Sequence, residues 1–390
     1  MKVALVARDI APSEALGKHL APELQKRGHE VVAYLGSGKP LTQTLEEIRQ
    51  GVRNADVLVS GMSSSKELAE PEITACLTAA LQELSKKKIP FGFYGDTYHC
   101  YERARENAWF GPVREDADFF FSVNEEEAMA AKSVLTNPNL ISIATGNPTW
   151  EGYAFPKYTR AEVRAKYGIA DEEVLILAPG GGSPAVNTLI WGLLIDALAC
   201  IDKKSRVMIS YHPDDRTQEA VDPKVVAKLI KEGKDVISAL ADPSAQLNIY
   251  GDLKKFSSVP VEFLPNDVKT SDVLPGADIV VEWGSSIAIE AAHQRIPVAS
   301  ISTEIGRRMF SFSKTEKWEP VELLGVAWEA EADLYSIIGN MFDLLENRHG
   351  FLDALRARQS EVYPKLQEKG AAVKKMADVL EQIAQPATAK

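Results

Sequence analysis

Residues 278–292 read DIVVEWGSSIAIEAA. An apolar run leads into Gly284-Ser285-Ser286, and small and apolar residues then resume at helical spacing, which predicts a buried strand, a tight turn and the start of a helix. The first backbone N–H groups of a helix lack partners within it and attract phosphate. Glu290 follows Ser286 by four residues, so its carboxylate is expected on about the same helix face, where it can accept from a pair of ribose hydroxyls. The segment favours a nucleotide site, and a serine-capped turn without a ligand is the alternative.

The length and composition of the chain limit its class. At 390 residues it exceeds the usual size of one hydrophobic core, so two domains are expected. A net charge of −11 argues against nucleic acid as the main partner, because binding to a phosphate backbone needs a basic surface. The three cysteines are far apart and lack zinc-ligand spacing. No apolar run has the length of a transmembrane segment or a signal peptide, and we expect a reduced, cytoplasmic protein.

Strand-like and helix-like segments alternate along the chain. Apolar runs typical of buried strands occur at residues 3–7, 29–35, 55–60, 89–94, 118–123, 174–178, 206–211, 261–264, 279–282 and 296–301. Segments with helical periodicity separate many of these runs, which predicts parallel sheets covered by helices on both faces. The predicted fold is α/β, with two Rossmann-like doubly wound domains facing across a cleft. We place the first domain at residues 1–148, the second at 149–345, and a helical tail at 346–390.

Two loops of the second domain join the opening segment as candidate ligand contacts, because ligands of open α/β sheets bind at the carboxyl ends of strands. Gly180-Gly181-Gly182-Ser183 follows a predicted strand, and its exposed backbone N–H groups favour a pyrophosphate cradle, with a flexible loop as the alternative. This loop is neither a GxGxxG motif nor a P-loop. His212 follows the next strand and can donate to a phosphate or a base, although many single histidines are structural. Glu282, at the end of the opening strand, completes the candidate donor site.

The first domain offers candidates for acid–base chemistry. Asp96 and His99 share one loop after a predicted strand, where a carboxylate could orient the imidazole as a general base. Ser13 and Glu14 follow the first strand and form a second polar group, and a helix cap is the alternative for Ser13. Asp96, His99 and Glu14 are therefore the candidate catalytic residues, and Ser13 is a candidate substrate contact.

The ordered motifs resemble those of the GT-B superfamily, which contains two-domain glycosyltransferases and the non-hydrolysing UDP-N-acetylglucosamine 2-epimerases. Thr145-Gly146-Asn147-Pro148 resembles the TGNP segment of the epimerases, and His212-Pro213 resembles their HP pair. The glycine loop at residues 177–183 is similar to the loop that opens the second GT-B domain, and residues 284–291 (GSSIAIEA) resemble the nucleotide motif of the family, in which a Gly-Ser-Ser turn is followed by Glu-Ala. Residues 12–17 loosely resemble the first loop of lipid-A-disaccharide synthases.

The resemblance implies a UDP-type donor, with the diphosphate on the glycine loop and on Gly284–Ser286 and the ribose on Glu290. It also implies that the last helices cross back onto the first domain, and that no metal is needed, because helix dipoles and basic groups can stabilise the leaving diphosphate. The chain departs from the family in two respects. Its first loop lacks the glycine-threonine-arginine-proline-glutamate signature of the epimerases, and no Lys or Arg lies next to Gly180–Ser183 in the sequence.

We therefore expect a metal-independent glycosyltransferase that needs no cofactor and uses a nucleotide-diphosphate sugar, a UDP-sugar above all, as co-substrate. The second domain would bind the donor and the first domain the acceptor, with Asp96 or His99 deprotonating or orienting the acceptor hydroxyl. One alternative is an enzyme like the non-hydrolysing UDP-N-acetylglucosamine 2-epimerases. Another is a non-catalytic nucleotide-sugar binding protein. We expect no nucleic acid partner and no transmembrane segment, and a homodimer is among the assembly states considered.

Overall fold

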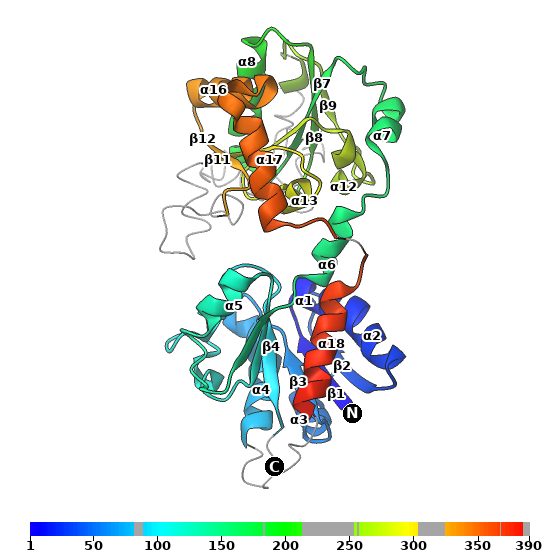
Figure 1. Ribbon diagram of the computed structural model, residues 1–390, viewed down its shortest axis with the longest axis vertical. Helices are drawn as coiled ribbons and strands as arrows, with labels where there is room; N and C mark the ends of the chain where they lie inside the picture. The colour runs from blue at the N-terminus through cyan, green and yellow to red at the C-terminus, as the bar shows by residue number, and fades with distance from the viewer. Residues whose placement is uncertain are drawn as a thin grey trace, which may run out of the picture. The chain divides into compact units, whose positions relative to one another are not determined.

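The structure is a computed structural model that describes residues 1–81, 89–181, 184–212, 253–255, 257–302, 324–366 and 368–384. The chain divides into two compact units (Figure 1). Unit 1 comprises Met1–Gly152 with Leu366–Lys390, and unit 2 comprises Tyr153–Lys365. Each unit contains a six-stranded sheet in which every described pair of neighbouring strands is parallel. The prediction of an α/β protein with two Rossmann-like, doubly wound sheets is confirmed.

The sheet of unit 1 has the order β2-β1-β3-β4-β5-β6. Its strands are β1 (Lys2–Ala7), β2 (Glu30–Leu35), β3 (Val57–Ser60), β4 (Phe91–Tyr94), β5 (Phe119–Ser122) and β6 (Ile141–Ala144). Every residue of β3, β4 and β5 is buried, as uninterrupted apolar runs in a covered parallel sheet require. The chain passes from β1 outward to β2 and returns to β3 on the other side of β1. The winding direction thus reverses between β1 and β3.

Helices cover this sheet. They are α1 (Ile10–Glu14), η1 (Ala15–Leu20), α2 (Ala21–Lys26), α3 (Leu45–Arg53), α4 (Lys66–Leu81), η3 (Cys100–Ala104), η4 (Gly111–Val113), α5 (Glu125–Ala131) and α6 (Pro148–Glu151). Helices α3, α5 and α6 begin at side-chain caps. Thr44 and Glu47 form a reciprocal capping box at α3, and the side chain of Asn124 accepts from the backbone of Glu127 at the start of α5. These caps fix where α3 and α5 begin.

The sheet of unit 2 has the order β12-β11-β10-β7-β8-β9. Its strands are β7 (Val174–Pro179), β8 (Ser205–Ser210), β9 (Val261–Phe263), β10 (Ile279–Glu282), β11 (Val298–Ser302) and β12 (Trp328–Glu331). Its helical segments are η5 (Gly152–Ala154, which begins at the last residue of unit 1), α7 (Arg160–Lys166), α8 (Pro184–Ala199), α12 (Thr270–Val273), η6 (Leu274–Gly276), α13 (Ile287–His293), α16 (Leu334–Glu346), η7 (Arg348–Gly350) and α17 (Phe351–Val362). The winding direction reverses here between β7 and β10.

The helical tail divides between the units. Helix α17 contacts α13 and α16 within unit 2, whereas α18 (Ala371–Ala384) packs on α2, η1, α6 and β3 of unit 1, the return that the resemblance implied (Figure 1). The chain therefore re-enters unit 1 near Leu366, whereas the predicted helical tail began at residue 346. The difference arises because the apolar face of α17 is already covered inside unit 2. The Glu151 carboxylate accepts from the N–H groups of Gly370 and Ala372, both at 2.6 Å, and so fixes the start of α18.

Candidate functional site

The predicted donor residues of unit 2 gather at the point where the winding direction reverses. Strands β7 and β10 are parallel neighbours, so the loops after Pro179 and Glu282 leave the same edge of the sheet side by side. In open α/β sheets, ligands bind at this crevice. The structure thus brings Gly180 and Gly181 next to the Gly284–Ser286 turn. Gly182 and Ser183, which were predicted to join them, lie outside the described residues.

Gly181 is fixed by two buried side chains that the sequence interpretation did not single out. Its N–H donates to Oδ1 of Asn187 at 2.8 Å, and its carbonyl accepts from Nδ2 of the same side chain at 3.1 Å. The indole Nε1 of Trp283 donates to the same Oδ1 at 2.7 Å. A Cβ on Gly181 would lie 2.6 Å from the Trp283 ring. This close approach requires glycine at position 181 whether or not a ligand binds there.

Glu282 stabilises the Gly284–Ser286 turn from the protein interior. Its side chain is fully buried, and Oε2 accepts the backbone N–H of Ser285 at 2.7 Å. Burial raises the pKa of Glu282, and hydrogen bonds from Ser285 and Ser300 oppose that shift. Gly284 has a φ of +84°, a conformation that favours glycine. Glu282, predicted as a nucleotide contact, therefore holds the shape of the turn from inside the protein.

The start of α13 presents the remaining donor candidates. Ser286 is exposed and its side chain makes no capping hydrogen bond, whereas Oγ of Ser285 accepts from the N–H of Ile287 at 3.4 Å. Glu290 is largely buried, and its Oε2 accepts from the Ser271 hydroxyl at 2.7 Å. Burial raises the pKa of Glu290, and the Ser271 hydrogen bond opposes that rise. Ser271, on α12, is a partner that depends on tertiary structure and was not predicted.

His212 lies two residues beyond β8, which pairs with β7, so its backbone is at the same edge of the sheet. Its side chain is half-buried. The neighbouring ring of Tyr211 stacks on Phe263 with centroids 5.3 Å apart, which holds the start of this loop against β9. His212 therefore belongs to the predicted donor edge.

In unit 1, Asp96 follows β4 at the carboxyl end of the sheet. Its side chain is half-buried, and burial raises its pKa while the charge of Arg103 opposes the rise. The thiol of Cys100 lies 3.5 Å from Oδ1. The backbone carbonyl of Asp96 accepts from Nδ2 of Asn147 at 2.7 Å. Asn147 belongs to the segment that resembles TGNP, so that segment braces the Asp96 loop within unit 1.

The carboxylate that approaches His99 is Glu127 of α5, in place of the expected Asp96. Oε1 of Glu127 lies 3.6 Å from Nδ1 of His99, and Oε2 accepts the His99 backbone N–H at 2.6 Å. The φ of His99 is +60°, and Nε2 is buried without a hydrogen-bond partner in the described part of the chain. Burial lowers the pKa of His99 and raises that of Glu127 to about 7.

The side chains of Ser13 and Glu14, which follow β1, form hydrogen bonds and an ion pair with nearby residues of unit 1. The buried Ser13 hydroxyl donates to the carbonyl of Ala7 at 3.0 Å and accepts from the N–H of Ser37 at 3.1 Å. Glu14 pairs with Lys18 at the helix surface. The structure therefore shows these two predicted residues in local contacts within unit 1.

Glu72, on α4, was not predicted as a site residue. It lies between the loops that follow β1 and β3. It is fully buried and accepts from the N–H and the hydroxyl of Ser63, at 3.0 and 2.9 Å, and from the N–H of Arg8 at 3.1 Å. Burial raises the pKa of Glu72 to about 7. The sequence pattern that could have identified Glu72 is an acidic residue on the apolar face of a helix. That face also carries Ala69, Ala75 and Cys76, which are buried.

Neither the scan against protein-family models nor the search of curated proteins finds a match. Among solved structures, the chain is similar to the UDP-GlcNAc 2-epimerase from Neisseria meningitidis bound to UDP-GlcNAc (16% identity, 98% of this chain and 100% of that chain, TM-score 0.58). It is also similar to a protein from Listeria monocytogenes described as a putative UDP-N-acetylglucosamine 2-epimerase (14% identity, 98% of this chain and 96% of that chain, TM-score 0.57). A third similar structure is MurG from Acinetobacter baumannii (12% identity, 98% of this chain and 99% of that chain, TM-score 0.53). These likenesses show that the chain has the GT-B fold. In the described residues, no helix combines the length and the apolar character needed to cross a membrane.

Proposed function

We propose that this GT-B-fold protein is a metal-independent glycosyltransferase that uses a UDP-sugar held by unit 2. The β7–β10 edge supports this assignment, because it combines a glycine-lined approach at Gly180 and Gly181 with the Gly284–Ser286 turn. Glu290 lies one turn further along α13, with Ser271 orienting its carboxylate. These are the groups that a diphosphate and a ribose require. The Neisseria structure, which holds UDP-GlcNAc in the same fold, supports the choice of donor class.

The observation that carries the transferase assignment is the pairing of His99 with Glu127. Because burial lowers the pKa of His99, its imidazole is neutral near pH 7 and can accept a proton. Glu127 lies beside Nδ1, which leaves Nε2 to act as the base. In the proposed step the acceptor hydroxyl oxygen bonds to the anomeric carbon, the bond from that carbon to the diphosphate breaks, and the hydroxyl proton moves to Nε2. Asp96 is the second candidate for orienting the acceptor.

A 2-epimerase acting on the same donor is the second candidate. In the described part of unit 1, three carboxyl groups have raised pKa values, namely Asp96 and, at about 7, Glu72 and Glu127. Epimerisation at C2 of the sugar needs groups that both remove and return a carbon-bound proton, and carboxyl groups that titrate near neutral pH are suited to that task. A nucleotide-sugar binding protein without turnover is the third outcome that the experiment has to separate.

The discriminating experiment is incubation of the protein with a panel of UDP-sugars in D₂O, with and without EDTA, followed by NMR and by an assay for released UDP. A transferase releases UDP, using candidate acceptors or slowly using water, and leaves C2 without deuterium. An epimerase forms the 2-epimer with deuterium at C2. A binding protein is thermally stabilised by UDP without turnover. Absence of both binding and turnover across the panel would overturn the proposal, and loss of activity in EDTA would overturn its metal independence.

A further inference from the structure

A cavity of unit 2 lies at the opposite edge of the sheet from the predicted donor turn. It has a volume of about 700 Å³. Its walls include Asp278 and Pro297, which immediately precede β10 and β11, so the cavity is at the amino ends of these strands. The donor turn at residues 284–286 follows the carboxyl end of β10. The proposed function uses none of the residues that line this cavity.

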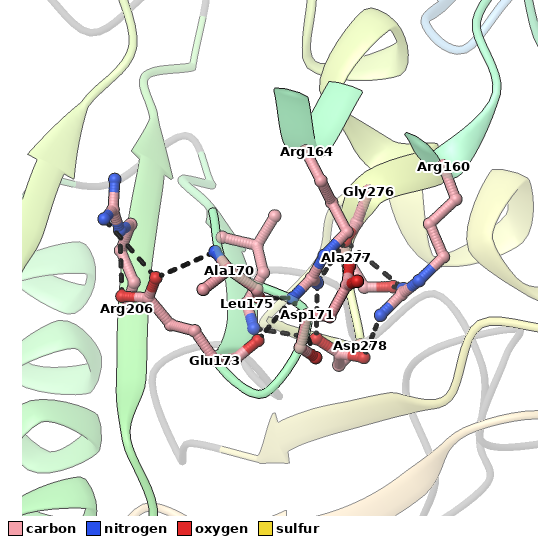
Figure 2. A network of polar contacts seen from close by, with 10 residues as sticks. All are labelled: Arg160, Arg164, Ala170, Asp171, Glu173, Leu175, Arg206, Gly276, Ala277 and Asp278. Carbon is pink, nitrogen blue, oxygen red and sulfur yellow. Dashed lines mark hydrogen bonds and ion pairs between the residues drawn. The ribbon is translucent and has the colours of Figure 1, made fainter. Parts of the chain in front are cut away.

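The charged groups around the cavity are predominantly positive. Asp278 is the acidic residue of its lining, and two arginines of α7 already neutralise it (Figure 2). Nη2 of Arg160 lies 2.5 Å from Oδ1, and Nη1 of Arg164 lies 3.1 Å from Oδ2. Oδ2 also accepts the N–H of Leu175 at 2.8 Å. The carboxylate of Asp278 therefore has no capacity left to neutralise the other cations of the lining.

Three further cations line the cavity: Arg295, Arg356 and Lys365. In the described residues, none of them has an acidic partner. The guanidinium of Arg295 is half-buried and donates to the carbonyls of Ala292, His293 and Tyr363, and burial lowers its pKa. A partly buried cation without a counter-ion is costly. These three charges are concentrated on one cavity of a protein whose net charge is −11.

Two neutral side chains of the lining add unpaired polar atoms. Nε2 of His293 and Nε2 of Gln294 are buried and lack hydrogen-bond partners in the described part of the chain. The His293 ring is held in place by Tyr363, stacked at 4.2 Å, and by Tyr153, edge-on at 6.0 Å. Buried polar atoms without partners are uncommon in folded proteins, and a bound ligand is one way in which they are satisfied. Oxygen atoms of an anion would pair with such nitrogen donors.

We propose that this cavity binds a small phosphate-bearing anion at a site separate from the donor edge. Its volume lies within the range of small-molecule sites, about 300–1,000 Å³. Arginine forms strong charge-assisted hydrogen bonds to phosphate, and lysine contributes a point charge. Helix α13 begins at the donor turn and ends at His293, so the two sites lie at opposite ends of the same short helix.

The test is isothermal titration of inorganic pyrophosphate into protein saturated with UDP, so that the donor edge is occupied. The double variant Arg356→Gln/Lys365→Gln is compared with wild type, because both side chains are exposed and neither forms an ion pair with the described residues. The control Lys166→Gln/Lys204→Gln removes two exposed cations of the same unit that lie outside the cavity. Circular dichroism verifies folding of both variants.

The proposal requires pyrophosphate binding in the presence of UDP, weakened about tenfold or more in the cavity variant and unchanged in the control. Equal binding by the wild type and the cavity variant would overturn it, as would displacement of all bound pyrophosphate by UDP. If UDP itself fails to bind, the proposed function is wrong. The same comparison made without UDP then still decides whether the cavity is an anion site.

Discussion

The indole Nε1 of Trp283 and the side chain of Asn187 meet in the core of unit 2, where Nε1 donates to Oδ1 at 2.7 Å. Trp283 directly follows β10 and Asn187 lies on α8, and both are fully buried. Because Oδ1 also accepts the N–H of Gly181, this one amide joins the loops of two neighbouring strands. The shape of the predicted donor edge therefore depends on a side chain that does not itself reach the ligand crevice.

We expect Asn187→Ala to lower the free energy of unfolding by about 2–4 kcal/mol, because it leaves buried donors on Trp283 and Gly181 without partners. Urea unfolding followed by circular dichroism measures the change. Leu189→Ala, at a position on the same helix that is 49% exposed, is the control and should change stability by roughly 0.5 kcal/mol or less. Equal effects of the two substitutions would show that the amide contributes little.

Gly181→Ala tests the close approach of the loop to Trp283. An added Cβ would lie 2.6 Å from the indole and 2.9 Å from the Trp283 carbonyl oxygen, so we expect a loss of about 1–3 kcal/mol. Gly192→Ala on α8 is the matched control, since its Cβ would meet its nearest neighbour at 3.9 Å. Alanine in a helix interior should stabilise there, by about 0.5–1 kcal/mol. The two melting temperatures should therefore move in opposite directions, and a shift in the same direction would contradict the packing argument.

Glu127 should make stability depend on pH. Its pKa is about 7 in the folded protein against an ordinary value of 4.5, so between these values the native state holds a proton that the unfolded state has lost. The contribution of this group to stability is therefore full at low pH and falls as pH rises towards 7, by up to about 3 kcal/mol. We expect Glu127→Gln to reduce the fall in unfolding free energy between about pH 5 and pH 8. Glu125→Gln, an exposed change on the same helix, should follow the wild-type curve, and identical curves for all three proteins would refute the assignment.

If Glu290 accepts hydrogen bonds from the ribose, Glu290→Gln should weaken UDP binding by about tenfold, because an amide oxygen is a poorer acceptor than a carboxylate. Calorimetric titration with UDP provides the dissociation constant. Glu172→Gln, an exposed change in the same unit, should bind UDP as the wild type does. Unchanged affinity in the Glu290 variant would remove this residue from the donor site.

Replacement of the proposed base has a kinetic consequence. His99→Gln should lower kcat/KM for UDP release by about 10²–10⁴-fold, the usual contribution of a general base, while UDP affinity stays constant. Glu127→Gln should retain part of the activity, because Glu127 positions the ring without accepting the proton. His349→Gln, which changes a histidine of unit 2 outside the predicted donor edge, should have wild-type rates. Full activity in the His99 variant would exclude its role as the base.

The sequence was sufficient for the features whose determinants are close together along the chain. Apolar runs such as that of β10, followed by glycine and serine, predicted the strands and the Gly284–Ser286 turn. The supporting partners were not predictable in this way. Asn187 and Trp283 are 96 residues apart, and His99 and Glu127 are 28 apart, so their pairing depends on which strands become neighbours. Asp96 was the carboxylate expected beside His99 because it is close in sequence, but the turn at His99 is followed by η3, and α5 supplies Glu127 instead.

The return of α18 to unit 1 makes unit 2 an insertion within the chain of unit 1. Residues 1–152 contain the whole sheet, but Met376 and Leu380 of α18 complete the apolar cluster that covers one face of β1 and β3. On the ribosome, the part of that face that α18 covers stays exposed until all of Tyr153–Lys365 and α18 have emerged, although η1 and α2 can already cover the rest. The continuous segment of unit 2 can complete its core earlier. The unit that is synthesised first is thus the one that finishes folding last, which reverses the usual N-terminal-first order of domain folding.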